Sequence, residues 1–502
     1  MVTGTIRRAP DTWVGNWNDK QPRVTPNARL PTREASFRLK SALPAQLHSA
    51  PIGRIPDHPL DDNMVRHCKR LLSNPAFITV VAFALRMGTL YYAWRTSRLE
   101  VRSFLPYGFE LGRIASSIAA GKGFSSPLRS MDTGPSAWFT PIYPYLVAGI
   151  FKIWGIFSDA SKLMIEVLNC VFAALTVIPI YEISRKAFGR GVAVAASWAW
   201  VVLPSALFFP IFWIWDTACA ALFLALIAWA TLGVVRSKSV LVWAGYGALW
   251  AVGVLVNPSL FSLFPFLAGW ALWQSRESST SWIKLGTAAL LVFAIGLSPW
   301  TIRNYRVFGK FVPLRSNFGL ELWLGNNPDV PDTWTPWLHP NDDPKEGAKY
   351  ARMGEMAYMA EKQHEAFVFM RTHPADTVNF MFRRFVENWL GQSDSPADVW
   401  SNGPLYVKGF VALNVFLSLA TWMGAMFAYR ARRPEAFPLV AVPLIFPLVF
   451  YLTHLSLRYR FPMDPIMVVL ATYAVAHIVS VLRGRRAEMA EGAGPVAPLP
   501  TT

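Results

Sequence analysis

Two acidic residues stand out because each lies beside strongly apolar sequence. Glu110 lies in the segment FLPYGFELGRIASSIAAGKGFSSP, where Phe109, Ile114 and Ile118 lie near helical spacing. Asp216 lies between the apolar stretches FFPIFWIW and TACAALFLALIAWA. A carboxylate in such a place could act as a general base on a hydroxyl group or hold a divalent cation. An ionisable side chain at membrane depth usually faces a cavity with a partner.

Both acids also have a purely structural interpretation. Glu110 has the i,i+3 spacing for a salt bridge with Arg113. Asp216 could cap a helix that begins at Thr217. The residues alone favour the salt bridge for Glu110 and leave both interpretations of Asp216 open.

Basic residues close to the last apolar run could bind a phosphate group. Arg458 and Arg460 lie in THLSLRYRFPMDP, with His454 and Tyr459 beside them. The planar guanidinium fork often binds phosphate oxygens in pairs. Anchoring to ordinary phospholipid headgroups is the alternative. We favour a specific phosphate site because this charge is predicted to lie on the face where positive charge is not favoured.

The segment SPWTIRNYRVFGKFVPLRSNFGLELWLGNNP, residues 298–328, combines basic side chains with Glu321 and several aromatic rings. Aromatic faces and amide groups suit a carbohydrate, but they also suit any wet interface. The histidines lack a metal-ligand spacing and are expected to be structural; they include His339, His364 and His373.

The elements that must position these residues are predicted to be membrane-spanning helices. The chain of 502 residues is 53% hydrophobic and 16% charged, against about 25% charged for a soluble domain. A spanning helix needs roughly 20 mostly apolar residues. Ten runs approach that length: 75–94, 164–183, 191–212, 217–235, 240–256, 258–274, 284–301, 409–429, 437–453 and 464–482.

An eleventh apolar run, 141–157, is short, aromatic and interrupted by Lys152. The distribution of basic residues favours ten spans over eleven. With a cytoplasmic N-terminus, ten spans place the basic clusters of the short loops inside, and a further span would reverse this. The 141–157 run is therefore predicted to be an interfacial helix on the outer side. The net charge of +17 has its most compact clusters in such loops, which argues against nucleic acid as a partner.

This topology divides the chain into parts. The sequence predicts an all-α polytopic membrane protein with about ten transmembrane helices, an interfacial helix and a helical subdomain on the outer face. The predicted parts are a basic, largely disordered cytoplasmic extension (1–74), an N-terminal transmembrane module (75–302) with its first outer loop (95–163), a large periplasmic loop (303–408), C-terminal transmembrane helices (409–482) and a cytoplasmic tail (483–502). Of the three cysteines, Cys68 lies in the extension, and Cys170 and Cys219 lie in apolar runs.

The order of these motifs resembles the multi-spanning glycosyltransferases of the GT-C fold, in particular the protein O-mannosyltransferases and lipid A aminoarabinose transferases (family 39-like). The motifs are FELGRIASSIAAGKGF, TGPSAWFTPIYPYL, SRKAFGR, WDT and SPWTIRNY, over roughly residues 75–482. The resemblance implies a polyprenyl-phosphate sugar as donor, Glu110 as catalytic base and Asp216 as the second acid, which orients the acceptor or a metal. That family most often has Asp at the first position, whereas this chain has Glu110.

The resemblance and the predicted sidedness together suggest further site residues. Arg458 and Arg460 would bind the donor phosphate, and the other substrate-binding candidates are Arg113, Asp132, Tyr143 and Arg303. Asp132 is also the alternative to Glu110 as the base. The metal requirement stays open; Glu110 and Asp216 would hold any divalent cation.

The sequence thus predicts a glycosyltransferase that moves a sugar from a lipid-linked donor to a protein, lipid or glycan on the periplasmic face. Membrane lipids are the other expected partners. The predicted location is the inner (plasma) membrane, with both termini cytoplasmic. No nucleotide-binding loop such as G-x-x-x-x-G-K-[ST] is found. The alternatives are a flippase or transporter of a lipid-linked saccharide, an O-antigen polymerase or ligase, and a non-catalytic scaffold.

Overall fold

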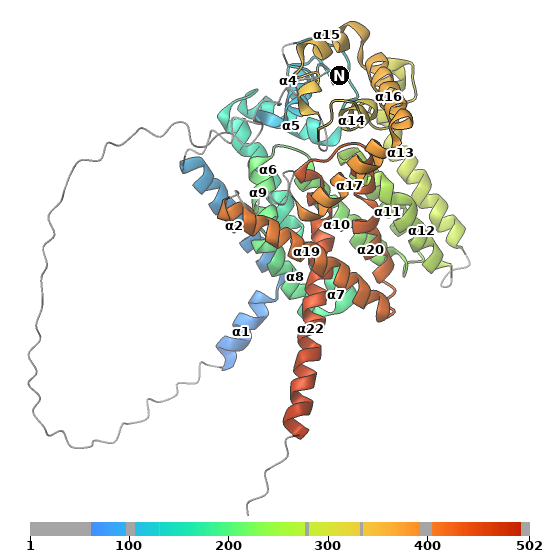
Figure 1. Ribbon diagram of the computed structural model, residues 1–502. Coiled ribbons are helices and arrows are strands. Elements are labelled where there is room, and N and C mark those ends of the chain that lie inside the picture. The colour runs from blue at the N-terminus through green and yellow to red at the C-terminus, as the bar shows by residue number, and fades with distance from the viewer. Residues whose placement is uncertain are drawn as a thin grey trace, which may run out of the picture. The chain divides into compact units, whose positions relative to one another are not determined.

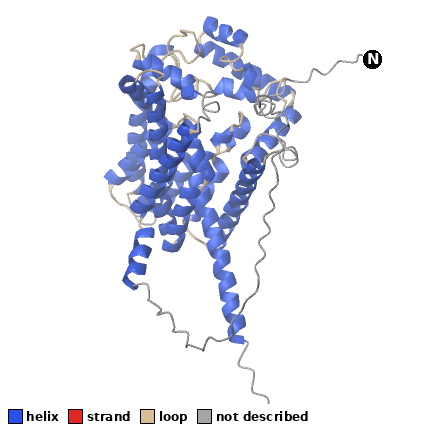
Figure 2. Ribbon diagram, turned by 90° about the vertical axis from the view of Figure 1, so that its left-hand side faces the viewer, coloured by secondary structure: helices blue, strands red, loops and turns tan. Residues whose placement is uncertain are grey.

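The computed structural model describes residues 62–96, 106–129, 131–276, 281–331, 335–391 and 404–492. All of them belong to one compact unit, Leu60–Thr502. Within these ranges the secondary structure is helical, apart from one isolated β-bridge between Ser125 and Pro135 (Figure 2). The predicted all-α fold is confirmed.

Long apolar helices form the body of this unit (Figure 1). Among the described residues, six stretches are long and apolar enough to cross a membrane, or seven if one bent pair is a single span. The six are α2 (Pro75–Arg95), α6 (Asp159–Leu175) continued by α7 (Val177–Phe188), α10 (Thr217–Val234), α13 (Trp282–Phe308), α19 (Leu405–Arg430) and α22 (Asp464–Gly492) preceded by a short 3-10 segment. The bent pair is α8 (Arg190–Val202) and α9 (Pro204–Phe212), which meet at 45°.

Three of the ten predicted spans form shorter or broken helices. They are α11 (Val240–Val256), the 3-10 helix η2 (Pro258–Leu263) with α12 (Phe264–Ser275), and α20 (Ala436–Ile445) with α21 (Leu448–Leu452). Prolines explain the breaks, because Pro lacks a backbone N–H and clashes with the preceding turn. Pro265 lies in the first turn of α12, where η2 ends, and Pro447 lies between α20 and α21.

The predicted interfacial run forms α5 (Ile142–Trp154), which has 13 residues. At about 1.5 Å per residue it is roughly 20 Å long, too short for the hydrocarbon core of about 30 Å.

A second group of helices gathers at one end of the unit (Figure 1). They are α4 (Glu110–Ala119), α5, α14 (Phe318–Gly325), α15 (Pro344–Met353) and α16 (Glu355–Thr372), with α17 (Pro374–Leu390) leading back to the spans. Their side chains share one apolar core, which includes Leu111, Trp138, Leu320 and Tyr358. The first loop and the long 303–408 segment therefore fold together.

The last part of the predicted N-terminal extension is helical. It forms α1 (Asp62–Leu72), which lies at the end of the unit opposite α15 (Figure 1). Asn74 caps α2 by accepting a hydrogen bond from the Ala76 amide at 2.9 Å, and Pro75 occupies the first helical turn. Residues 1–61 of the predicted extension lie outside the described residues.

Candidate functional site

A turn with unusual backbone angles presents Glu110. Tyr107, Gly108 and Phe109 all have positive φ, at 64°, 74° and 44°. Non-glycine residues rarely adopt such angles, which cluster at functional sites. A Cβ on Gly108 would lie 2.3 Å from the carbonyl oxygen of Ile214. Only glycine permits this approach, which packs the Glu110 turn against the segment that leads to Asp216.

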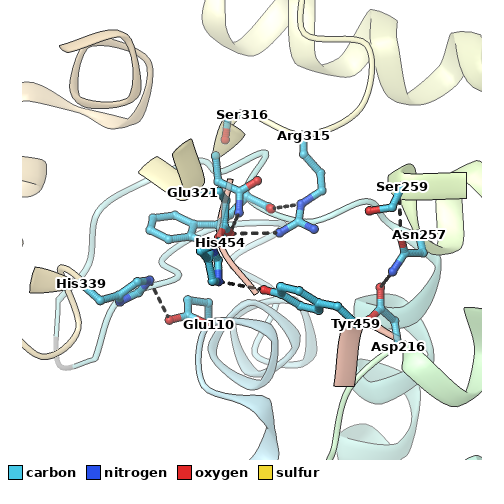
Figure 3. Close-up of polar contacts among 12 residues, drawn as sticks. Glu110, Asp216, Asn257, Ser259, Arg315, Ser316, Glu321, His339, His454 and Tyr459 are labelled. Carbon is cyan, nitrogen blue, oxygen red and sulfur yellow. Dashed lines mark hydrogen bonds and ion pairs between the residues drawn. The ribbon is translucent and has the colours of Figure 1, made fainter. Parts of the chain in front are cut away.

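Glu110 is buried, with 7% of its surface exposed, and its neighbours come from the long loop. The Asn341 side-chain amide donates to Glu110 Oε1, and His339 Nε2 lies 3.5 Å from the same oxygen (Figure 3). Burial raises the pKa of Glu110 to about 7, although the hydrogen bond from Asn341 lowers it. Burial also lowers the pKa of His339. The side chain thus has the proton affinity of a general base that works near neutral pH.

Asp216 is also buried and has an amide partner. Its Oδ2 accepts a hydrogen bond from Asn257 Nδ2 at 3.1 Å, and the Ser259 amide fixes Asn257 at 3.0 Å (Figure 3). The carboxylate makes no capping hydrogen bond to α10. Burial raises the pKa of Asp216, and the charges of Arg315 and Arg458 lower it.

Arg458 is an electrostatic neighbour of both acids. Its guanidinium carbon lies 3.6 Å from the ring centroid of Trp215, the residue before Asp216. Arg460 has a different environment. It is buried, with its Nε 3.2 Å from Asp464 Oδ1, and it donates to the carbonyl of Trp389 at 3.3 Å. The two arginines predicted to act together therefore have different neighbours.

A chain of contacts not predicted from the sequence joins α14 to Arg458. Glu321 Oε2 lies 3.0 Å from His454 Nδ1, and His454 Nε2 lies 3.1 Å from the hydroxyl of Tyr459 (Figure 3). Burial lowers the pKa of His454 to about 3, so the ring is neutral. Because Nδ1 faces a carboxylate, it carries the proton, and Nε2 accepts a hydrogen bond from the Tyr459 hydroxyl. The sequence singles out Glu321 only as part of the 298–328 segment; its position as the lone acid in the apolar run FGLELWLG is the further signal that it is partly buried.

Two other candidates, Arg113 and Tyr143, have structural partners. Among the described side chains, no ion pair joins Arg113 to Glu110; Arg113 lies over the ring of Phe157, 5.3 Å from its centroid. The Tyr143 hydroxyl donates to Asn169 Oδ1 at 2.7 Å inside the helical core.

Asp132 and Arg303 line a separate open cavity of about 550 Å³, together with Lys122 and Tyr145. Asp132 is exposed and lies 3.8 Å from Lys122 Nζ. Arg303 donates to the carbonyls of Phe124 and Ser136 at 2.8 and 2.6 Å, which ties the first loop to α13.

A buried carboxylate joins the first loop to the 303–408 segment. Glu355 Oε1 accepts hydrogen bonds from the Ala137 amide and the Ser316 hydroxyl, both at 2.6 Å. Its other oxygen accepts one from Tyr350 at 2.8 Å. Arg315, next to Ser316, donates to the Trp138 carbonyl at 2.8 Å. These contacts fix the long loop on the first loop.

Within the described ranges, no group of three or more His, Cys, Asp or Glu side chains is arranged to hold a metal ion. Both candidate metal ligands accept a hydrogen bond from a side-chain amide: Glu110 from Asn341 and Asp216 from Asn257.

Part of the chain matches a known protein family of the kind that the motifs suggest. Residues 138–302, about a third of the chain, match the family model described as dolichyl-phosphate-mannose-protein mannosyltransferase. None of the curated proteins matches the chain in sequence.

Solved structures with a similar course of the chain include the Archaeoglobus fulgidus oligosaccharyltransferase with zinc and sulfate (TM-score 0.45, 14% identity, 81% of this chain and 50% of that chain). Another is the archaeal oligosaccharyltransferase AglB from Archaeoglobus fulgidus in complex with an inhibitory peptide and a dolichol-phosphate (TM-score 0.41, 13% identity, 85% of this chain and 52% of that chain). The chain spans about half the length of each of these proteins. The segment 138–302, which matches the family model, contains Asp216 and the stretch from Trp138 to Tyr143. In that segment the chain is similar to the dolichyl-phosphate-mannose-protein mannosyltransferases, as the motifs predict.

Proposed function

We propose that this protein is a membrane glycosyltransferase that moves a sugar from a polyprenyl-phosphate donor to a hydroxyl-bearing acceptor. The observation that carries the proposal is the environment of Glu110, a buried carboxylate whose pKa is raised to about 7 and which has Arg458 as an electrostatic neighbour. The match to a dolichyl-phosphate-mannose-dependent family supports the class of donor.

In the proposed reaction Glu110 removes the proton from the acceptor hydroxyl. The acceptor oxygen forms a bond to the anomeric carbon as the bond from that carbon to the phosphate oxygen breaks, and the electron pair leaves with the polyprenyl phosphate. Arg458 balances the charge of the leaving phosphate, because a preorganised cation stabilises charge that develops in the transition state. Asp216, held by Asn257, orients the acceptor.

The proposal also covers the acceptor and the location of the enzyme. The acceptor is a protein, a lipid or a glycan on the periplasmic face, and the enzyme lies in the inner membrane with both termini in the cytoplasm. The clustering of α4, α14, α15 and α16 at one end supports chemistry on a single face (Figure 1). We assign no role in transfer to Arg460, because its contacts are with Asp464 and Trp389.

The test is a transfer assay with the purified full-length protein in liposomes, using a panel of polyprenyl-phosphate sugars. Wild type is compared with Glu110→Gln and Asp216→Asn, with and without a chelator. We expect release of polyprenyl phosphate with wild type and a loss of about a hundredfold or more in Glu110→Gln, since general-base catalysis contributes roughly 10²–10⁴-fold. Donor binding should persist in this variant.

Other outcomes would assign a different function. Movement of labelled lipid between leaflets without sugar transfer would identify a flippase. Transfer of whole saccharide chains that depends on arginines and tolerates both acid variants would identify a polymerase or ligase. Normal transfer by Glu110→Gln would remove this residue from the mechanism.

A further inference from the structure

Helix α1 has two chemically opposite faces in its last two turns. At 100° per residue, Arg66, Lys69 and Arg70 lie on one side of the helix, and Cys68, Leu71 and Leu72 lie on the other side. The residues from Arg66 to Leu72 are all exposed. Leu71 and Leu72 expose 41% and 48% of their surfaces, so the apolar face has no cover within the described protein.

The position of α1 next to the bilayer is fixed by the chain itself. Only Ser73 and Asn74 separate its last residue from α2, the first membrane-spanning helix. The indole Nε1 of Trp198 on α8 donates to the Leu72 carbonyl at 3.0 Å. The C-terminal end of α1, with Leu71 and Leu72, is therefore held close to the start of α2.

The exposed leucines and the basic side chains of α1 can be explained together. Exposed leucines in water are unfavourable, by about 25 cal/mol per Å² of apolar surface. Basic side chains opposite them suit anionic headgroups, which attract positive charge to the membrane surface. A helix in the membrane interface satisfies both faces at once. We propose that α1 binds the surface of the bilayer through anionic phospholipid headgroups, at the end of the protein opposite Glu110.

The chain has a natural probe for this contact. Of its three cysteines, Cys170 and Cys219 are buried, whereas Cys68 is exposed on the apolar face of α1. A charged maleimide that does not enter membranes will alkylate Cys68 when α1 lies in water and will be excluded when the apolar face is in the interface. A Cys68→Ser variant defines the background.

The experiment uses the full-length protein in nanodiscs of phosphatidylcholine, or of phosphatidylcholine mixed with phosphatidylglycerol. We expect the anionic lipid to slow alkylation by roughly an order of magnitude, and added salt to restore part of the rate, because salt screens exposed charges. The double variant Lys69→Gln/Arg70→Gln should react in the anionic nanodiscs nearly as fast as in the neutral ones.

A matched control removes the same charge at the other end. Lys345 and Arg352 are exposed on α15, and Lys345→Gln/Arg352→Gln should keep the protection of Cys68. Equal alkylation rates of the wild type in both lipids would overturn the proposal, and this measurement does not depend on any variant. Protection by a soluble polyanion in neutral nanodiscs would also overturn it and assign α1 to an acidic macromolecule. None of these readouts requires transferase activity.

Discussion

The central carbon of the Arg458 guanidinium lies 3.6 Å from the ring centroid of Trp215. This contact joins the segment between α21 and α22 to the segment that carries Asp216. A cation over an indole face is stabilised by the ring quadrupole, by roughly 0.5–2 kcal/mol depending on exposure. The contact holds a positive charge near both acids, and no ion pair with Arg458 is found among the described residues, so the charge can meet an anionic ligand.

Replacing Arg458 should impair use of the donor. We expect Arg458→Gln to lower kcat/KM by about a hundredfold, because a lost charge-assisted contact costs roughly 1.5–3 kcal/mol. Arg458→Lys keeps the charge but loses the planar stack and should be affected about tenfold. Initial rates against donor concentration give these values. Wild-type values for both variants would exclude Arg458 from donor binding.

Arg460 should affect stability instead. Removing it leaves Asp464 without its ion-pair partner at a position where both side chains are buried. Breaking such a pair costs about 3–5 kcal/mol, so Arg460→Gln should unfold at a lower temperature. The double variant Arg460→Gln/Asp464→Asn should recover part of that loss. Thermal unfolding in detergent, followed by tryptophan fluorescence, measures both; an unchanged Tm in Arg460→Gln would contradict the structural role.

The transfer rate should rise with pH through about 7 as Glu110 loses its proton. Asn341 donates to the carboxylate and so favours the ionised form. Asn341→Ala should therefore raise the pKa of Glu110 and move this limb of the profile to higher pH. The measurement is kcat/KM from pH 5 to 9. A profile of Asn341→Ala that moves to lower pH would contradict the assignment.

The same burial should make Glu110 destabilising at high pH. Its folded-state pKa of about 7 lies above the ordinary value of 4.5, so its stabilising contribution is complete below 4.5 and is lost as pH rises through 7. Glu110→Gln cannot ionise, so it should have a higher Tm than wild type at pH 8 and a similar one at pH 4.5. A lower Tm at pH 8 would show that the ionised carboxylate is well compensated.

The contacts from Glu321 through His454 to Tyr459 should position Arg458. His454→Gln breaks both contacts, and we expect the donor KM to rise several-fold while the pH profile set by Glu110 keeps its midpoint. Tyr459→Phe keeps the ring stacked on Phe450, with centroids 4.6 Å apart, and should have a smaller effect. Steady-state kinetics at several pH values separate the two parameters; a shifted midpoint with unchanged KM would instead link His454 to proton transfer.

The sequence singles out those candidate site residues that violate a local rule. Glu110 and Asp216 are acids beside apolar runs, and the cost of burying charge makes them conspicuous without a structure. The all-α fold follows from the same hydropathy, and the structure confirms it. The exact count of spans does not follow, because the runs 258–274 and 437–453 change or break their helix at Pro265 and Pro447, although their composition alone predicts continuous helices.

Partners across long sequence distances could not be predicted. Asn341 is 231 positions from Glu110 and becomes its neighbour only because the two outer segments share one core. Arg458 and Arg460 are two positions apart with the same chemistry, yet the irregular backbone between α21 and α22 turns them toward different neighbours. Spacing along the chain does not predict which way a side chain points.

The bond from the Ala137 amide to Glu355 has a consequence for biosynthesis. The two residues are 218 positions apart, and α6, α10 and α13 are synthesised between them. Ala137 therefore cannot make this bond until residue 355 has left the ribosome. A nascent chain arrested before that point contains both acids but lacks the carboxylate that holds the loop of Glu110. We therefore expect the two segments to lock together only after residue 355 has been synthesised.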